Sequence, residues 1–364
     1  MRTGKIESPN TINKLWTVAY DSGELAAATT SITISGLNGD VDEEYQLIIR
    51  KIGGSAAACD LRIFPNNDTT AANYGRQTLY SLDSESGASS DTAFANGLGL
   101  SNTTDQNKID LYDISINAKS GYIRTSINKM TNNISGTTVI FTFLTSLVWN
   151  NTVDNITSFV ISSDVTNGIG IGSRIILLKK VKLTTGIKTG KLNIQGSIKG
   201  TWETIYSNTL ASAATSVTIS NLTGNSDVLY RLRMRVVNGY AGTITVAIRP
   251  NNDTGANYGY QRIYGENTTV AASRDTGNDK IYTLNTSNTS VASAEELFYA
   301  KAGYVRTFLS QDVENAIETT IGDIVLKGQS WNNTADEITS LVIYANQANG
   351  LGIGTEIILE RLNL

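Results

Sequence analysis

The sequence has no histidine and only one cysteine, Cys59, among its 364 residues. A single cysteine excludes an internal disulfide, and the missing histidine removes the most common metal ligand and general base in proteins. Zinc sites of the usual kind and the Ser-His-Asp and Cys-His catalytic arrangements are therefore excluded. No pair of carboxylates stands out for glycoside hydrolysis either, so we expect neither an enzyme nor a bound cofactor.

Proline and charged residues are also scarce. There are three prolines, and charged residues make up 17% of a chain whose apolar runs are rich in isoleucine, valine and threonine. Residues branched at Cβ favour strands, so we expect an all-β protein with little helix. The net charge of −4 and the pI near 5.1 argue against a nucleic-acid partner, because phosphate binding needs clustered lysine and arginine.

Long apolar runs are missing as well. The opening residues 1–10, MRTGKIESPN, lack the apolar core of a signal peptide. No later stretch reaches the roughly 18 apolar residues that a membrane-spanning helix needs. We therefore expect a protein that is neither conventionally secreted nor inserted in a membrane.

The sequence does contain a long internal duplication. Six passages recur in the same order: LWTVAY returns as TWETIY, SITISGL as SVTISNL, FPNNDTTAANYG as RPNNDTGANYG, AKSGYIRT as AKAGYVRT, WNNTVDNITSFVI as WNNTADEITSLVI, and NGIGIGSRIILLKK as NGLGIGTEIILERL. A repeat this long indicates two duplicated domains rather than a solenoid, because each copy is large enough to close its own core.

The repeat divides the chain into four parts. They are an N-terminal arm (residues 1–14), a first β-sandwich module (15–180), a basic linker (181–200) and a second module (201–364). The linker contains no acidic residue and four lysines, Lys182, Lys188, Lys191 and Lys199. It is either a solvated connector or an arm that lies on an acidic neighbouring subunit.

Within each copy, apolar and polar residues alternate in short segments. Residues 31–35 (SITIS) and 45–50 (YQLIIR) follow the two-residue period of half-buried strands. Glycine and asparagine between such segments, as in residues 36–40, indicate tight turns and antiparallel pairing. We expect about eight strands per module in a jelly-roll-like sandwich, with a meander sandwich as the alternative.

The repeated PNND passage supplies side-chain oxygens at residues 66–68 and 251–253. Such oxygens are calcium ligands. Asparagine and aspartate after proline also build turns by bonding to nearby backbone groups. We favour the turn.

The best candidates for a ligand or subunit contact are aromatic, amide and arginine side chains that occur in both copies. They are Tyr74, Arg124, Trp149, Asn150 and Asn151 in the first, and Tyr258, Arg306, Trp331, Asn332 and Asn333 in the second. Aromatic faces can stack on a sugar while amides bind its hydroxyls. We favour the other interpretation, in which each tryptophan plugs the end of its sandwich and each arginine anchors a strand or a subunit contact.

At PNNDTGANYG, AKSGYIRT, WNNTADEITSLVI and NGIGIGSRIILLKK, the chain resembles a duplicated β-sandwich repeat family of tailed-bacteriophage virion structural proteins. The resemblance spans most of each module. It implies a virion component that assembles in the cytoplasm of the host bacterium. Its implied partners are capsid or tail subunits and further copies of itself.

The resemblance leaves two functions open. The first is a head-decorating, auxiliary capsid or tail-associated structural protein that acts through protein–protein contacts. The alternative is a receptor-binding or glycan-binding tail protein that holds a cell-surface sugar near Trp149 and Trp331. Sugar binding there requires at least one exposed indole face.

Overall fold

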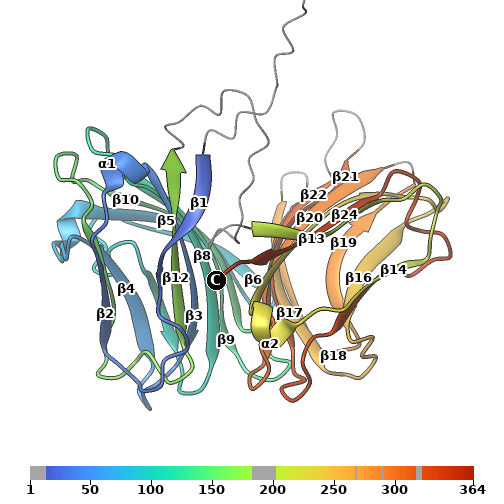
Figure 1. The fold of residues 1–364 in the computed structure, drawn as a ribbon, viewed down its shortest axis with the longest axis horizontal. Helices are drawn as coiled ribbons and strands as arrows, with labels where there is room; N and C mark the ends of the chain where they lie inside the picture. Colours follow the sequence, from blue (N-terminus) through green and yellow to red (C-terminus); the bar gives the residue numbers. More distant parts are fainter. Residues whose placement is uncertain (1–13, 183–201, 267–268, 289, 317–321) are drawn as a thin grey trace, which may run out of the picture.

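A computed structural model shows a protein built almost entirely from β-strands (Figure 1). It describes residues 14–182, 202–266, 269–288, 290–316 and 322–364. The N-terminal arm, except for residue 14, and the linker beyond residue 182 lie outside these residues. The described part contains two four-residue α-helices, α1 (Gly39–Asp42) and α2 (Gly224–Asp227), and a 3-10 turn, η1 (Ala71–Asn73). No helix among the described residues is long and apolar enough to cross a membrane.

Each module has twelve strands within the described residues, more than the sequence pattern indicates. Those of the first are β1 (Lys14–Asp21), β2 (Ser31–Ser35), β3 (Glu44–Ile52), β4 (Cys59–Pro65), β5 (Tyr74–Leu82), β6 (Glu85–Asp91), β7 (Leu100–Thr104), β8 (Ile109–Asn117), β9 (Arg124–Ile134), β10 (Phe141–Trp149), β11 (Ser158–Ser163) and β12 (Arg174–Lys182). The prediction of about eight strands was wrong because it relied on alternating apolar residues, which polar strands lack. Strand β6, with the sequence ESGASSD, is an example.

The second module repeats this series of strands. They are β13 (Trp202–Thr209), β14 (Ser216–Ser220), β15 (Leu229–Val237), β16 (Ile244–Pro250), β17 (Tyr258–Glu266), β18 (Thr269–Asn278), β19 (Ile281–Thr286), β20 (Val291–Tyr299), β21 (Arg306–Ala316), β22 (Asp323–Trp331), β23 (Ser340–Ala345) and β24 (Glu356–Leu362).

The strands of each module form one eight-stranded and one four-stranded sheet. The orders are β1-β12-β3-β8-β9-β10-β5-β6 and β2-β11-β4-β7 in the first module, and β13-β24-β15-β20-β21-β22-β17-β18 and β14-β23-β16-β19 in the second. The predicted pair of jelly-roll-like sandwiches is confirmed. The meander alternative was wrong, because strands far apart in sequence pair, as β12 does with both β1 and β3.

The core of each module lies between its two sheets. Strands β11 and β23 bury every second residue, as the two-residue period requires. Each core is one continuous cluster of aliphatic and aromatic side chains, closed in the first module by Trp149 and in the second by Trp331.

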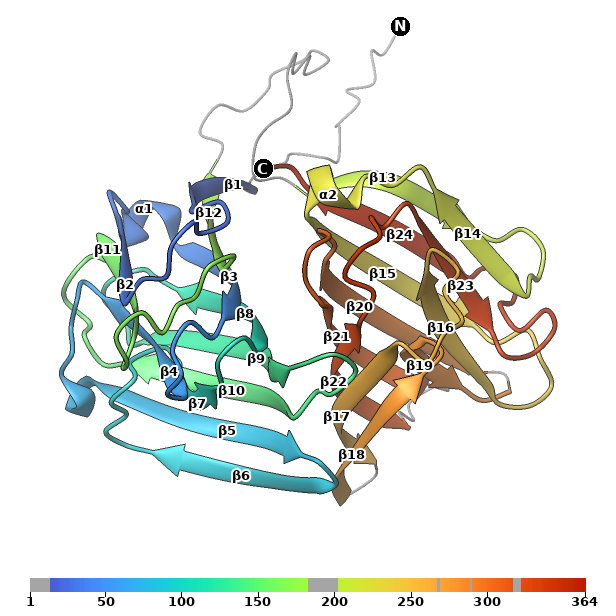
Figure 2. The same cartoon turned by 90° about the horizontal axis from the view of Figure 1, so that it is seen from below.

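The two modules pack through their eight-stranded sheets, so the four-stranded sheets lie on the outside (Figures 1 and 2). The chain therefore forms four layers. In both views α2 lies at the boundary between the modules, whereas α1 lies on the side of the first module that faces away from the second.

Candidate functional site

The repeated motifs meet at one end of each sandwich, where each tryptophan is tied to an aspartate. The indole nitrogen of Trp149 donates to Asp68 at 2.8 Å, and that of Trp331 donates to Asp253 at the same distance. Burial by itself would raise the pKa of both aspartates, but the hydrogen bonds that they accept outweigh it and lower the pKa below the ordinary value. Each carboxylate is thus a charged acceptor that holds a buried indole.

The PNND passages form turns. The backbone has positive φ at Asn66 and Asn67, 52° and 57°, and at Asn251 and Asn252, 51° and 54°. The side-chain oxygen of Asn66 accepts the backbone N–H of Thr157 at 2.8 Å, which ties this turn to the loop before β11. Asparagine tolerates this left-handed conformation, so the predicted turn is confirmed.

Each repeated arginine stacks on the neighbouring indole. The guanidinium carbon of Arg124 is 5.2 Å from the ring centroid of Trp149, and that of Arg306 is 5.3 Å from Trp331. Both arginines also donate to carbonyls of the loop that follows the tryptophan. Burial lowers the pKa of Arg306 to about 10, against the opposing effect of nearby Asp336. The two arginines anchor loops inside their own module.

The amide residues of the WNNT passages serve the same loops. The side-chain oxygens of Asn151 and Asn333 each accept two backbone N–H groups from residues two and three positions later. Asn150 and Asn332 each donate their backbone N–H to the loop that precedes β5 or β17.

The sugar-stacking platform considered for the tryptophans is not formed. Trp149 and Trp331 are 0% exposed, and Tyr74 and Tyr258 are buried beside them. Stacking needs a ring face that the sugar can reach. The structure therefore bears out the favoured interpretation, in which each tryptophan plugs the end of its sandwich.

A cluster of buried charges lies inside the second module. Lys327 donates to Asp312 at 2.8 Å and to the carbonyl of Thr283 at 2.7 Å, and it lies 3.5 Å from Glu314. Glu296 is also fully buried, and neither of its carboxylate oxygens has a well-formed hydrogen bond within the described residues. Three acids thus surround one lysine.

Burial decides how these groups ionise. It raises the pKa of Glu296 well above its ordinary value, and raises that of Asp312 to about 8, against the pull of Lys327. Burial opposes the charge on Lys327, but Asp312 and Glu314 outweigh it and raise the lysine pKa. Among the described residues, no group of three or more acidic or cysteine side chains could hold a metal ion.

The equivalent positions in the first module carry no charge. The positions equivalent to Lys327, Asp312, Glu314 and Glu296 are Thr145, Met130, Asn132 and Ile114. The first module instead buries a different pair, Lys51 and Asp110, with the lysine nitrogen 4.0 Å from the carboxylate. The fold therefore does not require charges at the Lys327 position.

Lys327 of this cluster also borders a pocket of about 190 Å³ between β17, β19 and β22. Tyr260, Arg262, Tyr282, Leu284, Asn285 and Lys327 line this pocket. The rings of Tyr260 and Tyr282 meet edge to face at 5.5 Å. Aromatic rings beside amide and guanidinium donors can hold a small polyhydroxylated molecule.

The contact between the modules centres on a buried arginine. The guanidinium carbon of Arg50 lies 4.3 Å from the ring centroid of Tyr299 and 3.8 Å from that of Tyr304, both from the second module. Glu24 lies 3.7 Å from Arg50, accepts the Tyr299 hydroxyl at 2.8 Å and accepts Lys301 at 2.7 Å. Because Arg50 is only 1% exposed, its charge depends on these partners from both modules.

Apolar side chains surround this arginine and form two unlike faces. The receiving face, on the first module, comprises Ile48, Arg50, Ile52, Leu111, Gly172 and Ile176; the docking face, on the second, comprises Leu297, Tyr299, Tyr304, Val305 and Leu309. A Cβ added to Gly172 would lie 2.2 Å from the Tyr304 hydroxyl, so this glycine lets the tyrosine approach the backbone.

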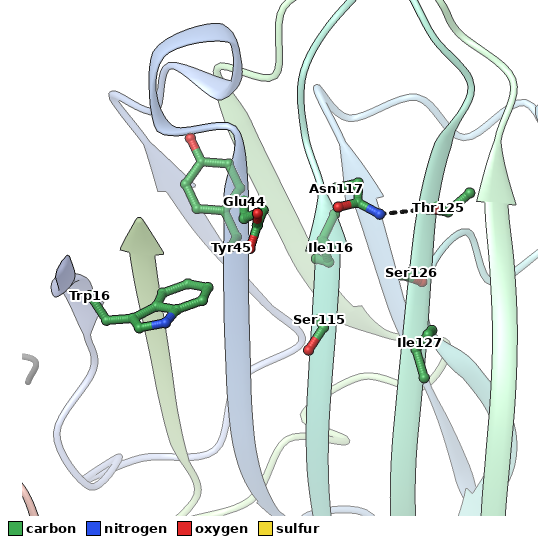
Figure 3. Close-up of a pocket in the computed structure, with 9 residues that line it drawn as sticks. All are labelled: Trp16, Glu44, Tyr45, Ser115, Ile116, Asn117, Thr125, Ser126 and Ile127. Atoms are coloured by element: carbon green, nitrogen blue, oxygen red, sulfur yellow. Dashed lines mark hydrogen bonds between the residues drawn. The ribbon is translucent and has the colours of Figure 1, made fainter. Parts of the chain in front are cut away.

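A shallow hollow marks the part of the first module that is equivalent to the docking face. It measures about 100 Å³ and is lined by residues that include Trp16, Glu44, Ser115, Asn117 and Ile127 (Figure 3). In this view Asn117 donates to the Thr125 hydroxyl, at 2.8 Å.

No protein-family model matches the chain, and no curated protein matches it. Among solved structures, domains LG4-5 of the mouse laminin alpha1 chain are similar with a TM-score of 0.20 and 7% identity, over 99% of this chain and 93% of that one. The LG1-3 region of the laminin alpha2 chain has a TM-score of 0.23 and 7% identity, over 93% of this chain and 65% of that one. Likeness at this level carries no argument about function.

Sequence reasoning missed both the contact between the modules and the pocket. It searched for passages that the copies share, whereas these features occupy positions where the copies differ. The pairs Ile48 and Arg233, Ser115 and Leu297, and Thr145 and Lys327 are examples. Such differences in polarity or charge between aligned copies are the signal that could have located them.

Proposed function

We propose that this chain is a bacteriophage virion structural protein, a head-decorating, auxiliary capsid or tail-associated component that acts through contacts with other virion subunits. Assembly takes place in the cytoplasm of the host bacterium and needs neither catalysis nor a cofactor.

One observation carries this proposal: the chain already contains an interface between two copies of its module. The interface combines a buried apolar core with the Arg50, Tyr304 and Glu24 contacts, which is the composition of a durable protein–protein contact. The shared Trp149 and Trp331 motifs support the same interpretation, because they close sandwiches instead of forming a reactive site.

The copy number of the protein in purified phage particles tests the proposal. Quantitative mass spectrometry against the major capsid protein gives this number directly. A ratio close to that of the capsid protein supports a shell or tail-tube component, and a small fraction supports a tail-tip or portal-proximal one. Absence from particles refutes the proposal.

A second candidate function is receptor or glycan binding by a phage tail protein, and the pocket of the second module favours it. Its volume of about 190 Å³ suits a single sugar residue, with Tyr282 as the stacking ring and Arg262 and Asn285 as hydrogen-bonding groups. The sugar therefore lies near β19 and β22 in this proposal, away from both tryptophans.

Titration calorimetry with a panel of monosaccharides tests this second function. Tyr282→Ala should weaken binding at least about tenfold, whereas Tyr240→Ala, which removes a tyrosine outside the pocket, should leave it unchanged. Binding to no sugar in the panel, or equal binding by both variants, rejects the pocket as a sugar site.

A further inference from the structure

Each module carries a docking face and a receiving face, but the chain uses only one of each. The docking face of the second module covers the receiving face of the first, around Arg50 and Tyr304. The docking face of the first module and the receiving face of the second have no partner of this kind within the described residues.

The unused docking face is exposed. Tyr122, Ile123 and Ile127 occupy the positions equivalent to Tyr304, Val305 and Leu309, and they are 72%, 52% and 57% exposed. Ser115 and Asn117 complete this face (Figure 3). Apolar side chains as exposed as these are typical of a surface that meets a partner.

The unused receiving face keeps the geometry of the used one. Arg235, the equivalent of Arg50, donates to the carbonyl of Gly354 at 3.3 Å, as Arg50 does to Gly172 at 3.2 Å. Both glycines have positive φ, 85° and 81°. The two faces differ in what lies over the glycine. A Cβ on Gly172 would collide with Tyr304, whereas a Cβ on Gly354 would meet nothing closer than 3.9 Å.

The chain does not close this second match on itself. Tyr122 is 72% exposed. A Cβ on Gly354 would meet only Val237, at 3.9 Å, whereas one on Gly172 would meet Tyr304. Within the described residues, Tyr122 therefore does not cover Gly354 as Tyr304 covers Gly172, which leaves the match to another molecule.

We propose that a second copy of this chain docks its Tyr122 loop on the receiving face around Arg235. The Tyr122 ring stacks on the Arg235 guanidinium, and the side chain of Ile123 packs beside Val237, as Tyr304 and Val305 do on the first module. Since unlike faces meet, the contact is heterologous and generates a ring or a filament. This inference deepens the proposed assembly function and rests on it.

The unused faces are more polar than the used ones, which fits a contact between separate chains. Ser115 and Asn117 stand where the second module has Leu297 and Tyr299, and Arg233 stands where the first has Ile48. The chain can thus remain soluble before it assembles.

Sedimentation velocity over a range of concentrations tests the proposal on the full chain. The wild type should form species larger than a monomer as concentration rises. Tyr122→Asp and Arg235→Glu should each raise the apparent dissociation constant at least about tenfold, while Val270→Ser, at an exposed residue outside both faces, should not change it. Ile123→Ser repeats the test without adding a charge.

A mixture of two variants makes the test specific. Tyr122→Asp keeps an intact receiving face, and Arg235→Glu keeps an intact docking face, so the equimolar mixture should form a one-to-one dimer that grows no further. A wild type that stays monomeric at every concentration, or a mixture without dimers, overturns the proposal. Association only with other virion proteins overturns it too, and leaves the copy-number test of the proposed function standing.

Discussion

Arg50 of the first module and Tyr304 of the second lie in direct contact, with the guanidinium carbon 3.8 Å from the centre of the tyrosine ring. A buried arginine over an aromatic face keeps its charge at a lower cost than one surrounded by aliphatic groups. This pair joins two modules that each have a complete core of their own.

Tyr304→Ala should lower the free energy of unfolding by about 1–3 kcal/mol, because Arg50 loses its stacking partner and stays buried. Urea denaturation at low protein concentration measures this change. Tyr122→Ala is the matched control, since it removes the equivalent but exposed tyrosine, and should change stability by less than about 0.5 kcal/mol. Equal effects of the two variants contradict the role given to Tyr304.

Gly172→Ala should destabilise the chain more than Gly354→Ala. Both substitutions place a Cβ on backbone with positive φ, so they share the conformational cost of about 1 kcal/mol. Only the first pushes into Tyr304, which should add about 1–3 kcal/mol. Thermal unfolding of both variants supplies the comparison, and an identical loss at the two glycines would mean that Tyr304 does not press on Gly172.

Asp253→Ala should cost about 2–4 kcal/mol, because the indole of Trp331 and the side chain of Asn257 lose a charged acceptor inside the sandwich end. Asp275→Ala, at an exposed position on β18, is the control and should be nearly neutral. Both are read by urea denaturation. A small change in the free energy of unfolding at Asp253 would mean that apolar packing alone stabilises this end of the sandwich.

The same aspartates should make the protein sensitive to acid. The pKa values of Asp68 and Asp253 are lower in the folded chain than the unfolded value of about 3.9. Their contribution to stability is therefore complete above about pH 4 and is lost as the pH falls through the folded values. Unfolding measured from about pH 5 downward tests this. The loss of stability on acidification should be smaller in Asp253→Asn than in the wild type.

Glu296→Gln should stabilise the protein at alkaline pH. The folded pKa values of Glu296 and Asp312 are raised, the second to about 8, so stability is fully present below the unfolded values and falls as the pH rises through the folded ones. At about pH 9 the variant should exceed the wild type by about 1–3 kcal/mol. Melting temperatures between about pH 5 and pH 9 measure this. Glu356→Gln, at an exposed position of β24, should leave the profile unchanged.

The sequence by itself determined the two modules, their all-β class and the PNND turns. The reason is that duplicated passages and alternating apolar residues report constraints that each module satisfies alone. Asn66 must adopt a positive φ, and Trp149 must close a core, in any copy of this sandwich.

Only the tertiary structure decided that the tryptophans are buried and that the modules meet around Arg50. A motif of tryptophan, asparagine and arginine has the same sequence whether its side chains face a ligand or a core. Whether they are buried depends on strands that are distant in sequence. The contact between the modules is asymmetric, so it lies where Leu297 replaces Ser115 rather than where the copies agree. Such a surface becomes visible only when both sheets are placed face to face.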